Sequence, residues 1–268
     1  MTGTPVPYVS EAQMREVDRL AVDEFGITLL QMMENAGRAL ARLARDRFLA
    51  GDARGKHVLV LAGPGGNGGG GLVCARNLHN WGADVRVVAT SRAEEMGDVP
   101  RHQLRILESL GVPTAVEPTD AAPDGAHLPD ADLIVDALIG YSLRGGLSRD
   151  RDRAGATAAL VRAANEHPAP TLALDVPTGV DATTGEAIGD AVRADATLTL
   201  ALPKEGLRAA AAAEYVGELY LADISIPAEL YARPTLGIEV GPLFASDDII
   251  RLGSGGPGAE ARGRSRGG

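Results

Sequence analysis

The sequence predicts an α/β fold in which helices cover both faces of a mainly parallel sheet. Short β-branched runs alternate with helical patterns through most of the 268 residues, as is typical of parallel sheets. A glycine-rich stretch, 63–71, follows the first predicted strand and precedes a helix. In open parallel sheets, ligands bind beyond the carboxyl ends of the strands, so this stretch is the first candidate for a binding site.

Two helices are expected before the first strand, as an addition to a plain doubly wound sheet. Capping-box patterns at 10–13 and 28–31 predict helices that run to about Asp23 and Phe48. The second helix carries an apolar stripe at helical spacing, made of Leu29, Met32, Met33, Ala36, Leu40 and Leu43. This stripe has two possible partners, the sheet of the same chain or a second subunit.

The remaining elements follow from short apolar runs bounded by turn residues. Strands are predicted at 57–62, 85–89, 114–117, 131–139, 171–176, 196–202 and 217–226, and helices at 72–81, 98–110, 151–166 and 205–213. A further helical turn is expected at 247–252. Residues 1–252 are predicted to form one domain, and the glycine- and arginine-rich segment 253–268 is predicted to be disordered.

Composition excludes several classes of function. A formal net charge of −10 disfavours nucleic acid and anionic membranes as partners. The one cysteine, Cys74, excludes an internal disulfide framework and a multi-cysteine metal site, and we expect it to pack as a small hydrophobe. Without an apolar run of membrane-spanning length or a signal-peptide core at the start, the chain is expected to be cytoplasmic.

Seven of the nine residues in 63–71 are glycine, and each costs backbone entropy on folding. Close approach of a ligand to bare backbone explains them better than a flexible surface connection, the other interpretation. A P-loop is excluded because no Gly-Lys-Ser/Thr follows. A nicotinamide dehydrogenase is disfavoured because the second strand ends at 88–91 without the acid that holds ribose hydroxyls.

Polar side chains follow several of the predicted strands at their carboxyl ends. Asn67 follows the first, Asp136 lies within VDALIG, Asp175 and Thr178 lie in LDVPTG, and Lys204 follows the strand at 196–202. Each could be structural on its own. Aspartates inside apolar runs need partners, however, because burial of a lone charge is costly. A cation or a polar substrate would supply those partners.

The chain resembles the NAD(P)H-hydrate epimerases (YjeF N-terminal domains) over roughly residues 13–227. The resemblance rests on QMREVDRLAVDEFGI, LLQMMENAG, GPGGNGGGGLVCARNL, IVDALIGYSLRGGL, LDVPTGVDATTG and DATLTLALPKEGL, in this order. It implies a Rossmann-like three-layer αβα sandwich, usually dimeric. It also implies an isomerase that interconverts the R and S forms of hydrated NADH and NADPH in metabolite repair, with a potassium ion (K⁺) beside the substrate.

The resemblance also implies roles for individual residues. Asn67, Asp136 and Thr178 correspond to the potassium ligands, although the family more often has serine at the last position. Asp175 corresponds to a substrate-contacting acid that can serve in proton transfer, with Lys204 as its possible catalytic partner. The substrate-binding segments correspond to Gly66, Asn67, Gly68, Gly69 and Gly70 in the glycine stretch and to Gly140, Tyr141, Ser142, Leu143, Arg144, Gly145 and Gly146, which would wrap the phosphates.

One departure from the family concerns the glycine stretch. The usual pattern is Asn-Asn-Gly-Gly-Asp-Gly, whereas residues 66–71 are Gly-Asn-Gly-Gly-Gly-Gly. Gly66 and Gly70 therefore lack side chains that contact substrate in the family. This leaves a second hypothesis, a non-catalytic nucleotide-binding or scaffold protein on the same fold. No dehydratase domain is expected on this chain, so a separate protein would complete a repair pathway.

Overall fold

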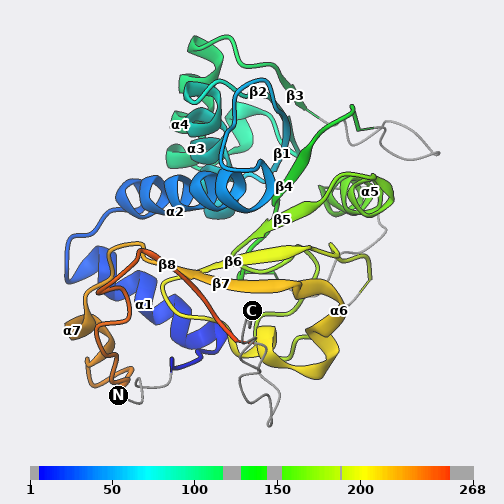
Figure 1. Ribbon diagram of the computed structural model, residues 1–268. Coiled ribbons are helices and arrows are strands. Elements are labelled where there is room, and N and C mark those ends of the chain that lie inside the picture. The colour runs from blue at the N-terminus through cyan, green and yellow to red at the C-terminus, as the bar shows by residue number, and fades with distance from the viewer. Residues whose placement is uncertain (1–5, 117–127, 144–152, 188, 254–268) are drawn as a thin grey trace, which may run out of the picture.

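The computed structural model describes residues 6–116, 128–143, 153–187 and 189–253 (Figure 1). They contain an eight-stranded sheet in the order β3-β2-β1-β4-β5-β6-β7-β8, in which β1 to β7 are parallel and β8 is antiparallel to β7. The strands are β1 His57–Ala62, β2 Asp84–Ala89, β3 Thr114–Val116, β4 Leu133–Ala137, β5 Thr171–Leu174, β6 Ala196–Leu200, β7 Glu218–Ala222 and β8 Ile249–Arg251. The predicted α/β class with a mainly parallel sheet is confirmed.

The order of the strands reverses beside β1. The chain runs from β1 outward to β2 and β3, and then returns to place β4 on the other side of β1, so that Val58 pairs with both Val85 and Leu133. Crevices at the carboxyl ends of strands around such a reversal are where ligands bind in open parallel sheets. The strand order therefore predicts a ligand-binding site at the carboxyl ends of β1, β4 and β5.

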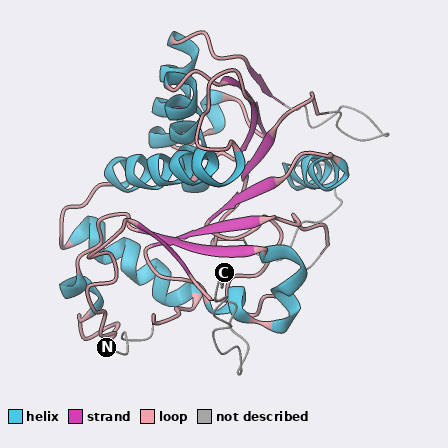
Figure 2. Cartoon of the chain, in the orientation of Figure 1, coloured by secondary structure: helices cyan, strands magenta, loops and turns pink. Residues whose placement is uncertain are grey.

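Helices cover both faces of the sheet (Figures 1 and 2). Side chains of α2, α3 and α4 share one apolar core with one face, and side chains of α5 pack on the other, as in a three-layer sandwich. The helices are α1 Glu11–Asp23, α2 Leu29–Leu43, α3 Gly66–Asn80, α4 Asp98–Ser109, α5 Arg153–Glu166, α6 Ala213–Val216 and α7 Ala228–Tyr231. Cys74 of α3 is fully buried, as expected, and burial raises the pKa of its thiol.

Of the two helices before the sheet, α2 covers one face, whereas α1 packs with α7 and with the segments that follow β6 and β7. Both predicted capping boxes form, and α2 continues to Phe48 through a π-helical turn, Ala44–Phe48. Met32 and Met33 are buried within the chain, and α2 crosses α3 so closely that a Cβ on Gly37 would lie 2.4 Å from Val73 Cβ. The methionine stripe thus packs inside this chain, and pairing with a second subunit stays a prediction.

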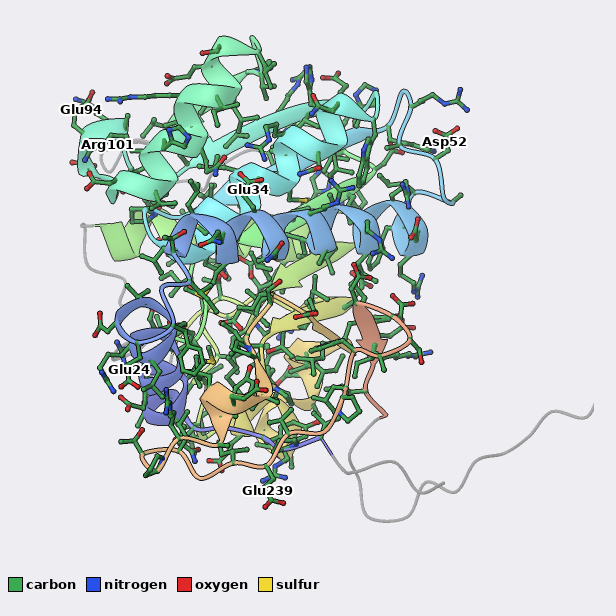
Figure 3. The ribbon with its side chains drawn as sticks, turned by 90° about the vertical axis from the view of Figure 1, so that its left-hand side faces the viewer. Glu24, Glu34, Asp52, Glu94, Arg101 and Glu239 are labelled. Carbon is green, nitrogen blue, oxygen red and sulfur yellow. The ribbon has the colours of Figure 1, made fainter. Side chains whose placement is uncertain are left out.

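Glu34 joins three helices on this face. Its carboxylate accepts hydrogen bonds from Arg76 of α3 at 2.5 Å and from Gln103 of α4 at 2.8 Å. Figure 3 shows Glu34 on the side of α2 that faces α3 and α4. The contact fixes α2 against the helix that begins at the glycine stretch, because Arg76 is only partly exposed and its charge is paired.

The prediction of a helix start at Leu72 is wrong, because α3 begins at Gly66. Packing explains most of these glycines. A Cβ on Gly68 would lie 1.8 Å from the Gly63 carbonyl oxygen, one on Gly69 would lie 2.4 Å from Met33 Sδ, and one on Gly71 would lie 2.4 Å from Ala137 Cβ. Glycine is therefore needed at these three positions because the first turns of α3 pack directly against neighbouring backbone and side chains, and not because a ligand approaches them.

The C-terminal predictions are also corrected in part. The helical turn expected at 247–252 is strand β8, which pairs Ile250 with Leu221 at the edge of the sheet. The helix expected at 205–213 is two 3-10 turns, Glu205–Arg208 and Ala210–Ala212, followed by α6. Residues 254–268, predicted to be disordered, lie outside the described residues, and the extent of the domain over 1–252 stays a prediction. Within the described residues, no helix combines the length and apolar character needed to cross a membrane.

Candidate active site

A cavity of about 540 Å³ opens at the carboxyl ends of β1, β4 and β6. Its wall includes a set of residues from the predicted site: Gly66, Asn67, Gly70, Gly140, Tyr141, Ser142 and Lys204. Further wall residues come from the two N-terminal helices and from the start of α4, namely Met14, Asp18, Leu29, Met32, Met33 and 97–100. One cavity thus joins segments that are far apart in the sequence.

Asp136 is the next-to-last residue of β4 and is fully buried. Its Oδ1 accepts hydrogen bonds from the Thr178 hydroxyl at 2.7 Å and the Leu138 N–H at 3.2 Å, and its Oδ2 accepts from the Thr178 N–H at 2.8 Å. All three donors are neutral. Burial raises the pKa of the Asp136 carboxyl to about 6, although these hydrogen bonds act to lower it. The carboxylate therefore has no charged partner among the described residues.

The residues around Asp136 fit a monovalent cation. Oxygen atoms are available from its carboxylate, from the Thr178 hydroxyl and from the Ile139 carbonyl, which lies 3.1 Å from that hydroxyl. Asn67 Nδ2 is buried without a hydrogen-bond partner among the described residues. Rotation of this amide by 180° puts its oxygen at that position, where a cation would supply the missing contact. Such neutral oxygens with a single carboxylate are typical of hard, weakly held cations.

Among the described residues, no multivalent metal centre of the usual kind is formed. In the part of the chain that the structure describes, no three His, Cys, Asp or Glu side chains gather closely enough to hold a metal ion. The prediction of Asn67, Asp136 and Thr178 as potassium ligands stays a prediction, although Asp136 and Thr178 are in direct contact.

Asp175 follows β5 and forms a buried ion pair with Lys204. Lys204 Nζ donates to Asp175 Oδ1, to the Leu200 carbonyl at 2.9 Å and to Thr199 Oγ1 at 3.5 Å. The backbone of Asp175 has a φ of +69°, a left-handed conformation that is uncommon outside glycine. Strained residues of this kind cluster at functional sites, so the geometry at the end of β5 is consistent with a role in chemistry.

Tyr141 connects this ion pair to the cavity. Its N–H donates to Asp175 Oδ2 at 2.9 Å, and Lys204 Nζ lies 5.7 Å from the centroid of its ring. A Cβ on Gly140 would lie 2.8 Å from Asp175 Oδ2 and 2.9 Å from Asn67 Oδ1. Gly140 therefore lets the two predicted sites approach each other across the bare backbone of the loop after β4.

Some of the predicted residues are not on the cavity wall. Gly68 and Gly69 pack inside the protein, and Leu143 packs against the apolar core under α5. Asp136, Asp175 and Thr178 are buried behind the wall. Arg144, Gly145 and Gly146 lie outside the described residues. The assignment of substrate-binding roles to all of these residues stays a prediction.

The N-terminal segment braces the site lysine. Val9 forms a parallel β-bridge with Lys204, in which the Val9 N–H donates to the Pro203 carbonyl and the Glu205 N–H donates to the Val9 carbonyl, both at 2.9 Å. Asp18, on the following helix, is a wall residue to which sequence reasoning gave no role. Met14 and Asp18 are four residues apart and therefore lie on the same face of α1, and both line the cavity. This spacing is the sequence feature that places Asp18 beside Met14.

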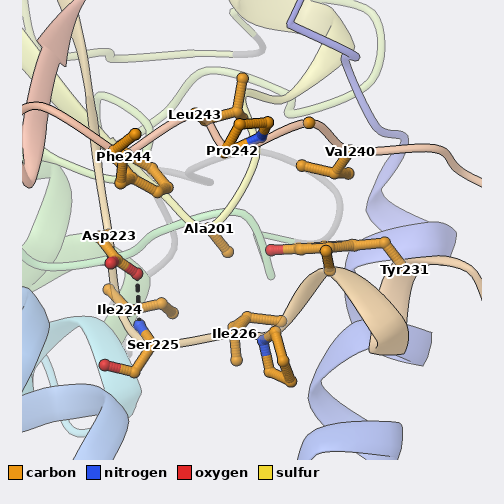
Figure 4. Close-up of a pocket in the computed structure, with 14 residues that line it drawn as sticks. Ala201, Asp223, Ile224, Ser225, Ile226, Tyr231, Val240, Pro242, Leu243 and Phe244 are labelled. Atoms are coloured by element: carbon orange, nitrogen blue, oxygen red, sulfur yellow. Dashed lines mark hydrogen bonds between the residues drawn. The ribbon is translucent and has the colours of Figure 1, made fainter.

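A second cavity, of about 420 Å³, lies beside the C-terminal segment (Figure 4). Its wall includes Tyr231, Phe244 and Asp223, whose carboxylate accepts the Ser225 N–H at 2.7 Å. It holds none of the predicted site residues. The cavity at the ends of β1, β4 and β6 is therefore the candidate active site.

Comparison with known proteins identifies the family. A family model described as "YjeF-related protein N-terminus" matches residues 29–206. This chain belongs to that family. The YjeF-related fold is also found in a crystal structure of the yeast protein ynu0, which matches with a TM-score of 0.72 and 28% identity over 92% of this chain and 100% of the yeast chain.

Several curated YjeF-related proteins are similar over most of the chain. An "NAD(P)H-hydrate epimerase" of Dehalogenimonas lykanthroporepellens is 43% identical, with 93% of this chain and 94% of that protein covered. One of Rhodopirellula baltica is 35% identical, with 84% and 87% covered. A "Bifunctional NAD(P)H-hydrate repair enzyme Nnr" of Moorella thermoacetica is 35% identical over 84% of this chain but only 41% of its own length. The family resemblance seen in the sequence is confirmed.

Proposed function

We propose that this protein epimerises hydrated NADH and NADPH. The observation that carries the proposal is the buried Lys204–Asp175 ion pair directly behind a cavity at the strand reversal, with Lys204 itself on the wall. A buried, paired acid and base of this kind beside a cavity is typical of an active site. Relatives that are named as epimerases over nearly their full length support the same reaction.

The chemistry follows from where water adds to a reduced nicotinamide. Addition to its enamine double bond puts the hydroxyl on the carbon next to the ring nitrogen. Epimerisation at this carbon requires the hydroxyl to leave as water and water to return on the other face. Asp175 would exchange a proton with this water, Lys204 would hold its negative charge, and the segment 140–146 with the start of α3 would hold the phosphates.

A potassium ion is the cofactor in this proposal, held by Asn67, Asp136 and Thr178. When bound, the ion would compensate the negative charge of Asp136. The hydrogen bonds between Asp136 and Thr178 support this assignment, because they hold two of the three residues at the joined ends of β4 and β5. A homodimer and a cytoplasmic location also belong to the proposal and are still predictions.

A non-catalytic nucleotide-binding protein is the second candidate, and the glycine stretch favours it. A Cβ on Gly66 would meet only Met33 Cε, at 3.6 Å, so this position has room for the family's asparagine. A Cβ on Gly70 would lie 2.8 Å from Leu174 Cδ2, and Leu174 is fully buried. The aspartate usual in the family therefore does not fit at Gly70 without movement of the core.

An assay on the separated R and S hydrates of NADPH, with and without potassium, tests the proposal. We expect the purified protein to accelerate interconversion in both directions, and Gly66→Asn to raise the rate. Gly66→Asn/Gly70→Asp should melt at a lower temperature than Gly66→Asn, because overpacking of a core typically costs about 1–3 kcal/mol. Binding of NADP⁺ without any acceleration would establish the second candidate instead.

A further inference from the structure

Asp18 lies on the wall of the same cavity, and its carboxyl group has no role in the proton transfer proposed for Asp175 and Lys204. It lies on α1, and both it and Tyr141 line the cavity wall. Its Oδ2 accepts a hydrogen bond from the Tyr141 hydroxyl, and no group among the described residues donates to its Oδ1. One carboxylate oxygen is thus fixed by the protein, and the other is available to a ligand.

Tyr141 is hydrogen-bonded to both Asp18 and Asp175, through opposite ends of the residue. Its hydroxyl donates to Asp18 at the far end of the side chain, and its N–H donates to Asp175 Oδ2 at the backbone. The two carboxyl groups come from separate elements, α1 and the end of β5. Asp18 lies on the cavity wall and Asp175 is buried behind it, and Tyr141 links the two carboxyl groups.

Epimerisation gives a reason for two such groups. The hydroxyl leaves from one face of the ring, and water returns on the opposite face of the planar intermediate. A group that protonates the departing hydroxyl cannot also reach the incoming water unless the intermediate turns over. A single acid such as Asp175 would therefore serve only one face.

Building on the proposed function, we propose that Asp18 is the second proton-transfer residue, acting on the ring face opposite to the Lys204–Asp175 pair. In one direction, protonated Asp18 gives its proton to the hydroxyl. The C–O bond breaks, its electron pair leaves with water, and the ring nitrogen's lone pair forms a C=N bond. Water then adds to the other face, the C=N electron pair returns to nitrogen, and Asp175 takes the proton that this water loses.

The two carboxyl groups end this step with exchanged protonation states. Epimerisation in the reverse direction, or exchange of protons with solvent, restores them. Burial raises the pKa of the Asp18 carboxyl, and the nearby charge of Asp175 acts in the same direction. The Tyr141 hydrogen bond and the positive charges of Lys204 and Arg15 act to lower it. The net increase favours the protonated form that the proposed step requires. The Tyr231 hydroxyl also lies near Asp18, whose charge acts to raise the pKa of that hydroxyl.

Asp18→Asn tests the role with little change of shape. We expect epimerisation to fall by about 10²–10⁴-fold, the usual contribution of a general acid–base group, with the Kd for NADP⁺ within about threefold of the unmutated protein. Tyr141→Phe keeps the carboxyl and should cost about tenfold or less, as expected for one hydrogen bond. Asp23→Asn changes an exposed carboxylate of the same helix and should alter neither quantity.

A chemical rescue separates proton transfer from structure. Asp18→Ala should be inactive and regain activity when formate is added, because formate can occupy the vacated space and transfer the proton. Full epimerase activity in Asp18→Asn, or a folded Asp18→Ala that formate does not rescue, would overturn the proposal. If the unmutated protein binds NADP⁺ and never epimerises, the proposed function fails first and the role of Asp18 falls with it.

Discussion

The carboxyl ends of β4 and β5 carry two aspartates that are both hidden from solvent and are compensated in different ways. Asp175 has the ammonium group of Lys204 as a permanent partner. Asp136, which is fully buried, receives hydrogen bonds only from neutral donors, and its pKa is raised to about 6. The Lys204 side chain compensates the carboxylate after β5, whereas the carboxylate at the end of β4 has no cationic partner among the described residues.

Removal of Lys204 should have the largest effect. Lys204→Met leaves the Asp175 charge buried and unpaired, so we expect the free energy of unfolding to fall by about 3–5 kcal/mol, with loss of epimerase activity. Denaturant unfolding measures the change. Lys56→Met, at the only other lysine of the chain, is the matched control and should be close to neutral. The double variant Lys204→Met/Asp175→Asn should regain part of the loss, and equal instability of single and double variants would contradict this account.

Asp175→Asn should have the second-largest effect, a loss of rate together with a loss of stability, because the buried Lys204 ammonium group loses its counter-charge. Asparagine tolerates the left-handed backbone at this position, and Lys204 keeps its contacts with Leu200 and Thr199. We expect kcat for epimerisation to fall by about 10²–10⁴-fold while the Kd for NADP⁺ changes little. The measurement is steady-state kinetics below the melting temperature of both proteins. An unchanged kcat would show that Asp175 is only structural.

The smallest effect should be the loss of potassium-dependent stability at Asp136. A ligand at ten times its Kd stabilises the native state by about 1.4 kcal/mol, so potassium should raise the melting temperature by a few degrees relative to tetramethylammonium at equal ionic strength. Asp136→Asn should abolish this difference. Thr178→Ser, which keeps the hydroxyl, should preserve it, and Thr178→Val should not. Identical melts of the unmutated protein in the two salts would refute the cation site.

Local signals were enough to predict much of the fold. The capping boxes at Ser10 and Thr28 form because their partners are three residues away, and the buried strands follow from short apolar runs. The polar residues at strand ends were also predicted to converge, because parallel strands deliver their carboxyl ends to one edge. Contact between Asp136 and Thr178 and between Asp175 and Lys204 follows from that rule.

Features that depend on packing between distant segments were not predictable in the same way. The glycine pattern of 66–71 predicts close approach of a ligand, whereas most of these glycines make room for Gly63, Met33 and Ala137. Asp18 gains its place at the cavity only because α1 docks beside the loop after β4. The sequence predicts a helical turn at 247–252 instead of strand β8. A run of three residues is too short to determine its own conformation, and pairing with β7 makes it a strand.

The bridge between Val9 and Lys204 has a consequence for the time at which Lys204 is held in place during synthesis. It joins the beginning of the described chain to a residue that the ribosome adds 195 positions later. Contacts between segments so far apart form slowly, since the intervening chain must first be brought together. Lys204 is therefore held by Val9 only after the chain has emerged past residue 204 and these two segments have met, so a shorter nascent chain lacks this contact.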